Sequence, residues 1–112
     1  MKRMICVSLL AAAVLGCAPA MAQDAKAGRA KASAQCAVCH GTDGIAQMPT
    51  AANLAGQQEV YLAKALEDFR AGRRVNEMMT VVSKELTDAD IANLSAWYAS
   101  MKVTVQVPER AP

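Results

Sequence analysis

The sequence predicts an all-α fold with three main helices, and three stretches of the chain carry this prediction. Residues 24–39 are rich in alanine and lysine and contain no proline, a composition that favours a helix. A second stretch places Leu62, Leu66 and Phe69 at helical spacing, with charged side chains on the other faces. A third stretch begins at Thr87 and continues with apolar residues at the same spacing.

The first predicted helix begins at Asp24, whose carboxylate can accept hydrogen bonds from the free N–H groups of the first turn. Its inward face would use Ala25, Gly28 and Ala32, which are all small. Small side chains let a neighbouring helix approach closely. We therefore expect this helix to cross another one at short distance.

The ends of the other two helices have recognisable signals. Gly72 is expected to end the second helix in the left-handed conformation that glycine adopts easily. Thr87 and Asp90 have the spacing of a capping box at the start of the third. The apolar stripe of that third helix consists of Ile91, Leu94, Trp97, Tyr98 and Met101.

The segments between the helices are expected to be irregular. Residues 41–53 contain two glycines, a proline and an asparagine, so this stretch is predicted to be a loop. Residues 73–85 are predicted to be a connection, and residues 103–112 an extended tail without a partner strand.

The first 22 residues have the features of a secretory signal peptide. A short apolar run over residues 5–15 is followed by the small-x-small sequence of residues 20–22, which predicts cleavage before Gln23. This signal predicts export to the periplasm. An alternative stays open, because residues 14–17 resemble a bacterial lipobox, in which Cys17 would be lipidated and would anchor the protein.

Charge and size limit the possible functions of the mature segment. Without Lys2 and Arg3, the 12 basic residues fall to 10 and match the 10 acidic ones, so the formal charge is zero. Nucleic-acid binding is not expected, since it would call for a basic stripe. The aromatic residues are few, and a chain this short usually needs a cofactor, metal or covalent staple to complete its core.

One pentapeptide, Cys36-Ala37-Val38-Cys39-His40, has the C-x-x-C-H form that marks covalent attachment of a c-type haem. Two thiols add across the two vinyl groups of the porphyrin, and their spacing fits one helical turn. His40 follows directly and is the only histidine of the chain. The pattern therefore predicts Cys36 and Cys39 as the haem thioethers and His40 as an axial iron ligand.

Three alternative readings of this pentapeptide are weaker. A thioredoxin-like redox pair normally follows a strand in a βαβ unit, and no β-branched run precedes Cys36. A structural zinc site needs four ligands, and the mature segment offers only Cys36, Cys39 and His40. A disulfide between the two cysteines is the third alternative.

With these features placed, the sequence resembles the class I c-type cytochromes. More narrowly, it is similar to the small bacterial periplasmic cytochromes whose dihaem members carry two such domains. The resemblance spans residues 27–101 and rests on six matching stretches: residues 36–44, 54–57, 61–62, 68–74, 86–91 and 97–99, together with Met79. It implies a cytochrome c fold over residues 23–102, with loops wrapped around one covalently bound haem.

The chain departs from the family pattern at two positions. The family often has a proline where this chain has Ala52, and the carbonyl of that residue accepts the N–H of the proximal histidine. We expect the Ala52 carbonyl to take this role. The family also commonly has an aromatic residue where this chain has Ala32, so Trp97 or Tyr98 is expected to fill that contact.

Since His40 is already used, the second axial ligand is expected to be a methionine thioether, which stabilises ferrous iron and raises the reduction potential. Met48 lies close after the haem motif, and Met101 belongs to the apolar stripe of the last helix. Met78 and Met79 lie far enough downstream to reach the opposite face of the haem. The resemblance selects Met79, seven residues before Leu86, and Met78 is the alternative.

The expected function is transfer of single electrons between periplasmic or membrane-bound redox proteins, without enzymatic activity. In that role Arg70, Arg73 and Arg74 could attract an acidic partner or pair with the haem propionates, or could form an ordinary solvated rim. Two alternatives are kept. An open sixth position would make the protein a small-ligand sensor or a weak peroxidase. The chain could also be the cytochrome subunit of a larger dehydrogenase or oxidase.

Overall fold

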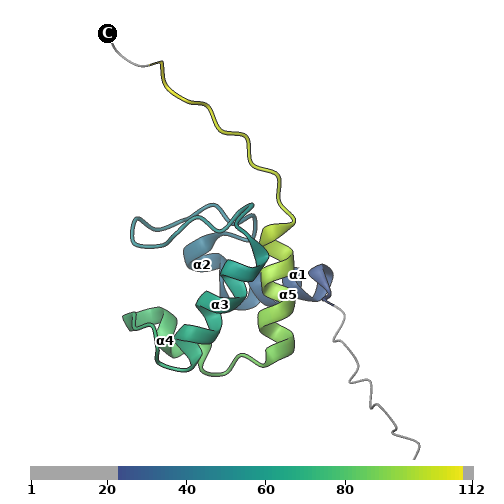
Figure 1. Ribbon diagram of the computed structural model, residues 1–112, viewed down its shortest axis with the longest axis vertical. Helices are drawn as coiled ribbons and strands as arrows, with labels where there is room; N and C mark the ends of the chain where they lie inside the picture. The colour runs from purple at the N-terminus through teal and green to yellow at the C-terminus, as the bar shows by residue number, and fades with distance from the viewer. Residues whose placement is uncertain (1–22, 110–112) are drawn as a thin grey trace, which may run out of the picture.

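Helices α1 (Ala25–Gln35) and α5 (Asp88–Ala99) cross each other, and the other elements are arranged around this pair (Figure 1). The computed structural model describes residues 23–109. All regular secondary structure in this part of the chain is helical, which confirms the predicted all-α fold. The remaining helices are α2 (Ala37–His40), α3 (Glu59–Arg70) and α4 (Glu77–Ser83). The signal-peptide and lipobox predictions fall on residues 1–22, outside the described residues.

Small residues allow the close crossing of α1 and α5, as the sequence predicts. A Cβ atom on Gly28 would lie 1.9 Å from the Asn93 carbonyl oxygen, so any side chain there would push the helices apart. Ala32 is fully buried in the same face. Asp24 caps α1 by accepting hydrogen bonds from the N–H groups of Lys26 and Ala27, at 2.8 and 3.1 Å.

The prediction of one continuous helix over residues 24–39 is wrong at its end. Helix α1 stops at Gln35, and Cys36 separates it from the short α2. Cys36 has φ −112°, away from the usual helical value, so the regular helix is interrupted there. Its carbonyl then accepts the His40 N–H at 2.9 Å, which begins the new turn. The pentapeptide therefore has a helical turn of its own.

Helix α3 ends as predicted at a glycine in the left-handed region. Gly72 has φ +72°, two residues beyond Arg70. The buried face of α3 contributes Leu62 to the core, where it packs with residues from α1 and α5. The core cluster consists of Ala32, Leu62, Leu86, Ile91, Leu94 and Tyr98. Helices α1, α3 and α5 thus supply most of it.

Helix α4 was not predicted, since residues 73–85 are expected to form an irregular connection. The side chain of Asn76 caps this helix and accepts hydrogen bonds from the N–H groups of Met78 and Met79, at 3.1 and 3.0 Å. The helix is only seven residues long and packs against α3. Its stability therefore comes from the cap and from α3, which periodicity in so short a segment does not reveal.

Helix α5 begins with the predicted capping box. The Thr87 hydroxyl accepts from the Asp90 N–H at 3.1 Å, and the Asp90 carboxylate accepts from the Thr87 N–H at 3.0 Å. Asp90 also pairs with Lys31 of α1 at 3.3 Å. The helix ends at Ala99, so Met101 lies beyond it. Residues 101–109 have no regular structure, and none of the helices in the described part is long and apolar enough to span a membrane.

Candidate haem site

Helix α2 and the residue before it bring both cysteines next to His40. The backbone of this turn is closed by the hydrogen bond from the His40 N–H to the Cys36 carbonyl. Cys36 and Cys39 are free thiols and are half-buried, so the disulfide alternative is not formed. Burial raises the pKa of the Cys36 thiol above its ordinary value, and a hydrogen bond with the Tyr98 side chain partly opposes this. Two free thiols on one turn are what covalent haem attachment needs.

The imidazole of His40 is oriented by a backbone carbonyl. Its Nδ1 lies 2.7 Å from the carbonyl oxygen of Ala52. Because a carbonyl can only accept, Nδ1 must carry the proton, and Nε2 is then the unprotonated nitrogen that can bind iron. The expectation that Ala52 supplies this carbonyl in place of a proline is confirmed. Such a partner fixes the ring plane and raises the basicity of the ligand nitrogen.

The loop that carries Ala52 is hydrogen-bonded to α2 and back to itself. The Gln47 N–H donates to the Cys39 carbonyl at 2.8 Å. The N–H groups of Leu54 and Ala55 both donate to the carbonyl of Gly44, at 2.7 and 3.1 Å. Gly44 has φ +74°, and a Cβ there would lie 2.5 Å from the Ala55 nitrogen, so only glycine fits. This network sets where Ala52 meets His40.

Two adjacent aromatic residues of α5 hold the two carbonyls that follow His40. The Tyr98 hydroxyl donates to the Gly41 carbonyl at 3.0 Å, and the Trp97 indole N–H donates to the Thr42 carbonyl at 2.9 Å. Tyr98 is almost fully buried, and burial raises its pKa well above the ordinary value, so its hydroxyl keeps its proton. The sequence predicts only a packing role for this pair. The hydroxyl of Tyr98 and the indole N–H of Trp97 could have indicated these hydrogen bonds, since buried Tyr and Trp usually find a partner.

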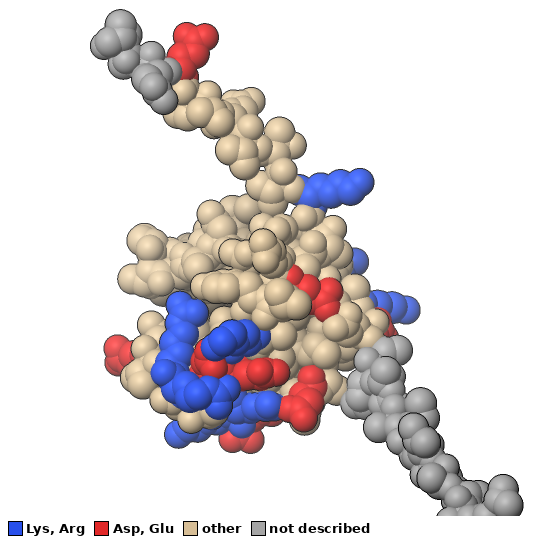
Figure 2. Space-filling view, in the orientation of Figure 1, with Lys and Arg blue, Asp and Glu red and all other residues tan. Residues whose placement is uncertain are grey.

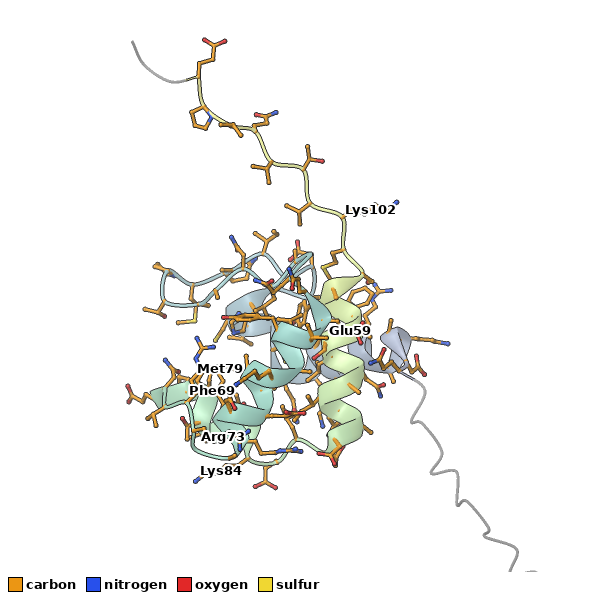
Figure 3. The ribbon with its side chains drawn as sticks, viewed as in Figure 1. Glu59, Phe69, Arg73, Met79, Lys84 and Lys102 are labelled. Atoms are coloured by element: carbon orange, nitrogen blue, oxygen red, sulfur yellow. The ribbon has the colours of Figure 1, made fainter. Side chains whose placement is uncertain are left out.

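The structure separates the four methionine candidates. Met79 lies on α4 (Figure 3) and is half-buried. Its neighbour Met78 is 62% exposed. Met48 lies in the loop after the haem motif and is 44% exposed. Met101 lines a shallow cavity beside Trp97. Among these, Met79 is the one that combines a capped helix with partial burial.

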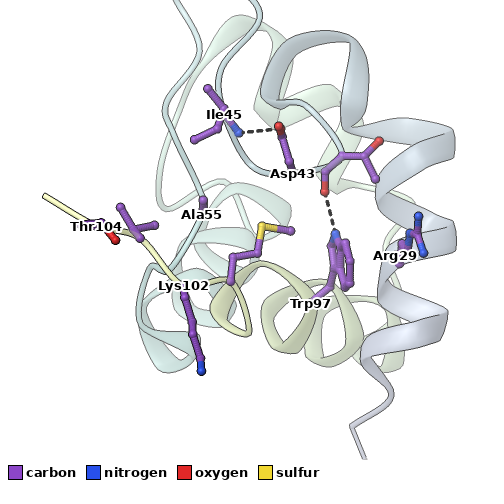
Figure 4. A pocket seen from close by; sticks show the side chains of 10 residues that line it. Arg29, Asp43, Ile45, Ala55, Trp97, Lys102 and Thr104 are labelled. Atoms are coloured by element: carbon purple, nitrogen blue, oxygen red, sulfur yellow. Dashed lines mark hydrogen bonds between the residues drawn. The ribbon is translucent and has the colours of Figure 1, made fainter.

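That shallow cavity is distinct from the candidate haem site. It measures about 670 Å³ and lies between α1, the loop after α2 and the start of the C-terminal tail (Figure 4). Its lining includes Trp97, Met101 and Val103 but none of Cys36, Cys39, His40 or Met79. Arg29 and Trp97 both line this cavity, and the Arg29 guanidinium lies over the Trp97 ring, 5.6 Å from its centre. Its lining offers one thioether, that of Met101, and no imidazole or thiol.

The residues around α2 and α4 fit a large apolar group. Among the described residues, no apolar side chain of α2 or α4 is in the buried core. Instead, apolar side chains of α3 and α4 stay exposed, with Tyr61 at 51% and Val81 at 64%. Two thiols, one imidazole nitrogen and one thioether form the donor set that haem c requires. Residues 23–109 contain no strand and no cluster of three metal-ligating side chains, so neither the βαβ nor the zinc alternative finds support.

The three arginines are engaged within the fold. Arg70 donates to the Leu86 carbonyl at 2.8 Å and pairs with Asp88 at 2.6 Å. Arg73 pairs with Asp68 at 2.8 Å. The hydrogen bond from Lys64, and to a lesser extent the one from Arg73, holds the pKa of Asp68 below its ordinary value. The guanidinium of Arg74 lies over the Phe69 ring, 4.6 Å from its centre. These contacts leave Arg74 as the one without a carboxylate partner among the described residues.

Comparison with known proteins shows the family of this chain. The family model described as cytochrome C oxidase, cbb3-type, subunit III matches residues 23–97. The chain belongs to the c-type cytochromes. This cytochrome is 42% identical to cytochrome c4 of Pseudomonas aeruginosa, over 94% of its own length and 51% of the relative. It is 39% identical to cytochrome c-554(548) of Halomonas halodenitrificans, over 72% of its own length and 100% of the relative.

Solved structures of relatives share the fold. The structure of reduced recombinant cytochrome c4 from Pseudomonas stutzeri matches with a TM-score of 0.64 and 38% identity. The match covers 75% of this cytochrome and 48% of that chain. The chain thus spans about half the length of its cytochrome c4 relatives. The cytochrome c fold is confirmed, and the cofactor of this family is haem c with its iron.

Proposed function

We propose that this cytochrome transfers single electrons between redox partners and that it holds one haem c. Cys36 and Cys39 would form the thioethers, and His40 and Met79 would be the axial ligands. One observation carries the proposal: the contact of His40 Nδ1 with the Ala52 carbonyl leaves Nε2 free on the turn that presents both free thiols. The chain contains a single C-x-x-C-H sequence, which supports one haem.

The protein residues contribute position and electronic tuning. Haem supplies one-electron chemistry at its iron when bound. The Ala52 carbonyl keeps His40 in one tautomer, and a methionine thioether as second ligand favours the ferrous state. His40 and Met79 would together hold the iron, and no site for oxygen or peroxide would then remain. The expected behaviour is therefore that of a carrier and not of an enzyme.

The place of action follows from the first residues of the chain. The proposed signal peptide over residues 1–22 would deliver residues 23–112 to the periplasm, where residues 23–102 form the cytochrome domain. Donor and acceptor would then be periplasmic or membrane-bound redox proteins. Mass spectrometry of the purified protein tests this. The expected mass is that of residues 23–112 plus one haem, whereas a diacylglyceryl group on Cys17 would show a lipoprotein.

Absorption spectroscopy tests the axial ligands. The ferric protein should show the weak far-red band that methionine–iron ligation produces. Met79→Ala should abolish this band, and Met78→Ala, the matched control, should keep it. If the band survives in Met79→Ala, the ligand assignment is wrong. If the wild-type protein lacks it, the sixth position is open, and the sensor or peroxidase alternative is favoured instead.

A second candidate function keeps the same chemistry and changes the partner. The family model that matches residues 23–97 describes a subunit of a cytochrome oxidase. This cytochrome would then work inside a larger redox complex. Affinity purification of the tagged protein from its own cells would distinguish the two, because a subunit should co-purify stoichiometrically and a shuttle should not.

A further inference from the structure

The proposed ligand Met79 lies in the first turn of α4, which is the part of a helix that its own backbone holds least. Helix α4 begins at Glu77, so Met79 is its third residue. The first four N–H groups of an α-helix have no partner within the helix. The groups that bind them therefore decide how firmly the start of α4, and Met79 with it, stays folded.

Asn76 and Thr80 close this turn around Met79 from both sides. The side-chain oxygen of Asn76 accepts hydrogen bonds from the N–H groups of Met78 and Met79, as described above. The Asn76 N–H donates to the Thr80 hydroxyl at 2.9 Å, and the Thr80 N–H donates to the Asn76 carbonyl at 2.9 Å. We call these four hydrogen bonds the Asn76 clamp. Asn76 lies three residues before the proposed ligand, and Thr80 follows it directly.

Little else holds this end of α4. Residues 71–78 are all exposed, and Val75 reaches 81%. Paired charges tether the chain only further upstream: Figure 2 shows blue and red atoms side by side over α3 and α4, where Arg73 pairs with Asp68 at 2.8 Å. The other end of α4 is anchored, because Ser83 is fully buried. The first turn can therefore open locally while the rest of the fold stays intact.

We propose that Asn76 is a positioning residue for the sixth iron ligand: its clamp keeps Met79 on the iron and thereby keeps small external ligands out. Opening of the first turn withdraws Met79 and leaves that position free. An external ligand binds only the opened form, so its apparent dissociation constant is the intrinsic value divided by the opened fraction. The proposal rests on the electron-transfer function with Met79 as ligand, and it names the residue that separates a closed carrier from a ligand-binding protein.

Binding of imidazole to the ferric holoprotein measures the opened fraction. Imidazole takes the place of the methionine, so its binding is followed by the loss of the weak far-red band. Asn76→Ala removes the cap of α4 and should raise the opened fraction about fivefold, which is the factor that a helix cap is typically worth. The apparent dissociation constant for imidazole should fall by the same factor. An unchanged dissociation constant would overturn the proposal.

Two milder variants test the clamp itself. Asn76→Ser keeps a capping side chain, so its imidazole affinity should stay within about twofold of wild type. Thr80→Val keeps the shape of the side chain but removes the acceptor of the Asn76 N–H, so it should strengthen imidazole binding about twofold or more. Thr80→Val decides the matter if Asn76→Ala does not fold, and wild-type affinity in this variant would then overturn the proposal.

Thr87→Ala is the matched control, because Thr87 caps α5, a helix without a proposed ligand. It should lower the free energy of unfolding about as much as Asn76→Ala does, since both variants remove a helix cap. Its imidazole affinity should stay within about twofold of wild type. If Thr87→Ala strengthens imidazole binding as much as Asn76→Ala, any loss of stability is sufficient, and the proposal is wrong.

The double variant Asn76→Ala/Met79→Ala shows whether Asn76 acts through Met79. Without the methionine the sixth position is already free, so adding Asn76→Ala to Met79→Ala should change imidazole affinity by less than about twofold. A fivefold change in this background would contradict the proposal. The far-red band keeps the two proposals apart. If wild type lacks the band, the ligand assignment fails and the clamp with it, whereas a normal band with unchanged imidazole affinity in Asn76→Ala refutes only the clamp.

Discussion

The turn that carries His40 is held by single residues from distant parts of the chain. Ala52 orients the imidazole, Gly44 allows the loop to fold back, and Tyr98 and Trp97 hold the next two carbonyls. Three of these contacts have a backbone carbonyl as the acceptor. At Gly44, the absence of a side chain leaves room for the backbone of Ala55. The orientation of the proposed ligand His40 therefore depends on residues that are not themselves proposed ligands.

Tyr98→Phe tests this dependence. The variant keeps the ring but removes the shorter of two hydrogen bonds to the Gly41 carbonyl, which also accepts from the Gly44 N–H at 3.3 Å, and should lower the free energy of unfolding by about 0.5–1.5 kcal/mol. The control is Tyr61→Phe, since Tyr61 is 51% exposed, and it should stay within about 0.5 kcal/mol of wild type. Guanidinium unfolding of the holoprotein measures both. Equal stability of the two variants would show that the Tyr98 hydroxyl contributes nothing.

Asp90 links a helix cap to a contact between helices, and its contribution should depend on pH. The pKa of Asp90 is lowered in the folded state, mainly by the hydrogen bond from the Thr87 backbone N–H. Hydrogen bonds with the side chains of Thr87 and Lys31 lower it further. The unfolded chain then binds more protons, so the stabilisation is present above the unfolded pKa of about 3.9 and is lost as pH falls through the folded value.

Asp90→Ala should therefore cost about 1 kcal/mol or more at pH 7 and progressively less below about pH 4. Urea unfolding of wild type and variant at both pH values gives the difference. A gap that stays constant down to pH 2 would mean that the carboxylate charge is not responsible. Asp43→Ala at the same pH values controls for general acid effects, since Asp43 is exposed and caps no helix.

Among the elements, the crossing of α1 and α5 fixes the frame, while α2 and α4 are short and carry the proposed ligands His40 and Met79. The crossing tolerates no side chain at Gly28, because the Asn93 carbonyl already occupies that space. Helix α4 depends on its Asn76 cap and on α3. Helix α2 follows α1 directly, and α4 packs against α3, which itself packs against α5.

Gly28→Ala should destabilise the protein by about 2–3 kcal/mol or more, since the added methyl group must separate two packed helices. Gly72→Ala is the matched control. A Cβ there meets nothing within 4 Å, so only its φ of +72° resists the change, at about 1–2 kcal/mol. Thermal unfolding followed by circular dichroism compares them. The packing argument fails if Gly28→Ala is the milder of the two.

At the scale of the whole molecule, the protein core is incomplete without its cofactor. The buried apolar residues come from α1, α3, α5 and the segment before α5, while α2 and α4 contribute none among the described residues. Apolar side chains of α3 and α4 remain exposed, including Tyr61 and Val81. A covalent macrocycle would bury such surface and hold the ligand-bearing segments together.

The double variant Cys36→Ser/Cys39→Ser cannot attach haem and should lose much of its helical structure. A core this small rarely stabilises a domain alone, so a broad, non-cooperative thermal transition is expected. Circular dichroism of the variant and of the holoprotein provides the comparison. The matched control is Cys6→Ser, which lies in the proposed signal peptide and should leave the mature holoprotein unchanged. A cooperative transition with full helicity in the haem-free double variant would show that the polypeptide core suffices.

Local sequence signals predicted much of this fold correctly. Asp24, Gly72 and the Thr87–Asp90 box act within a few residues of themselves, so the structure confirms them. The break at Cys36 and the helix α4 were not predicted. Both are short, and a turn or two of helix depends on neighbouring elements and caps more than on periodicity.

The sequence by itself determined the chemistry of this cytochrome: two thiols and a histidine in one pentapeptide, a single histidine in the chain, and helix signals around them. Only the tertiary structure decided how that chemistry is oriented. The Ala52 carbonyl meets His40, and Tyr98 meets Gly41, across separations in the chain of 12 and 57 residues. Residue types and local spacing carry chemical identity, whereas a contact between distant backbone groups exists only once helices have packed.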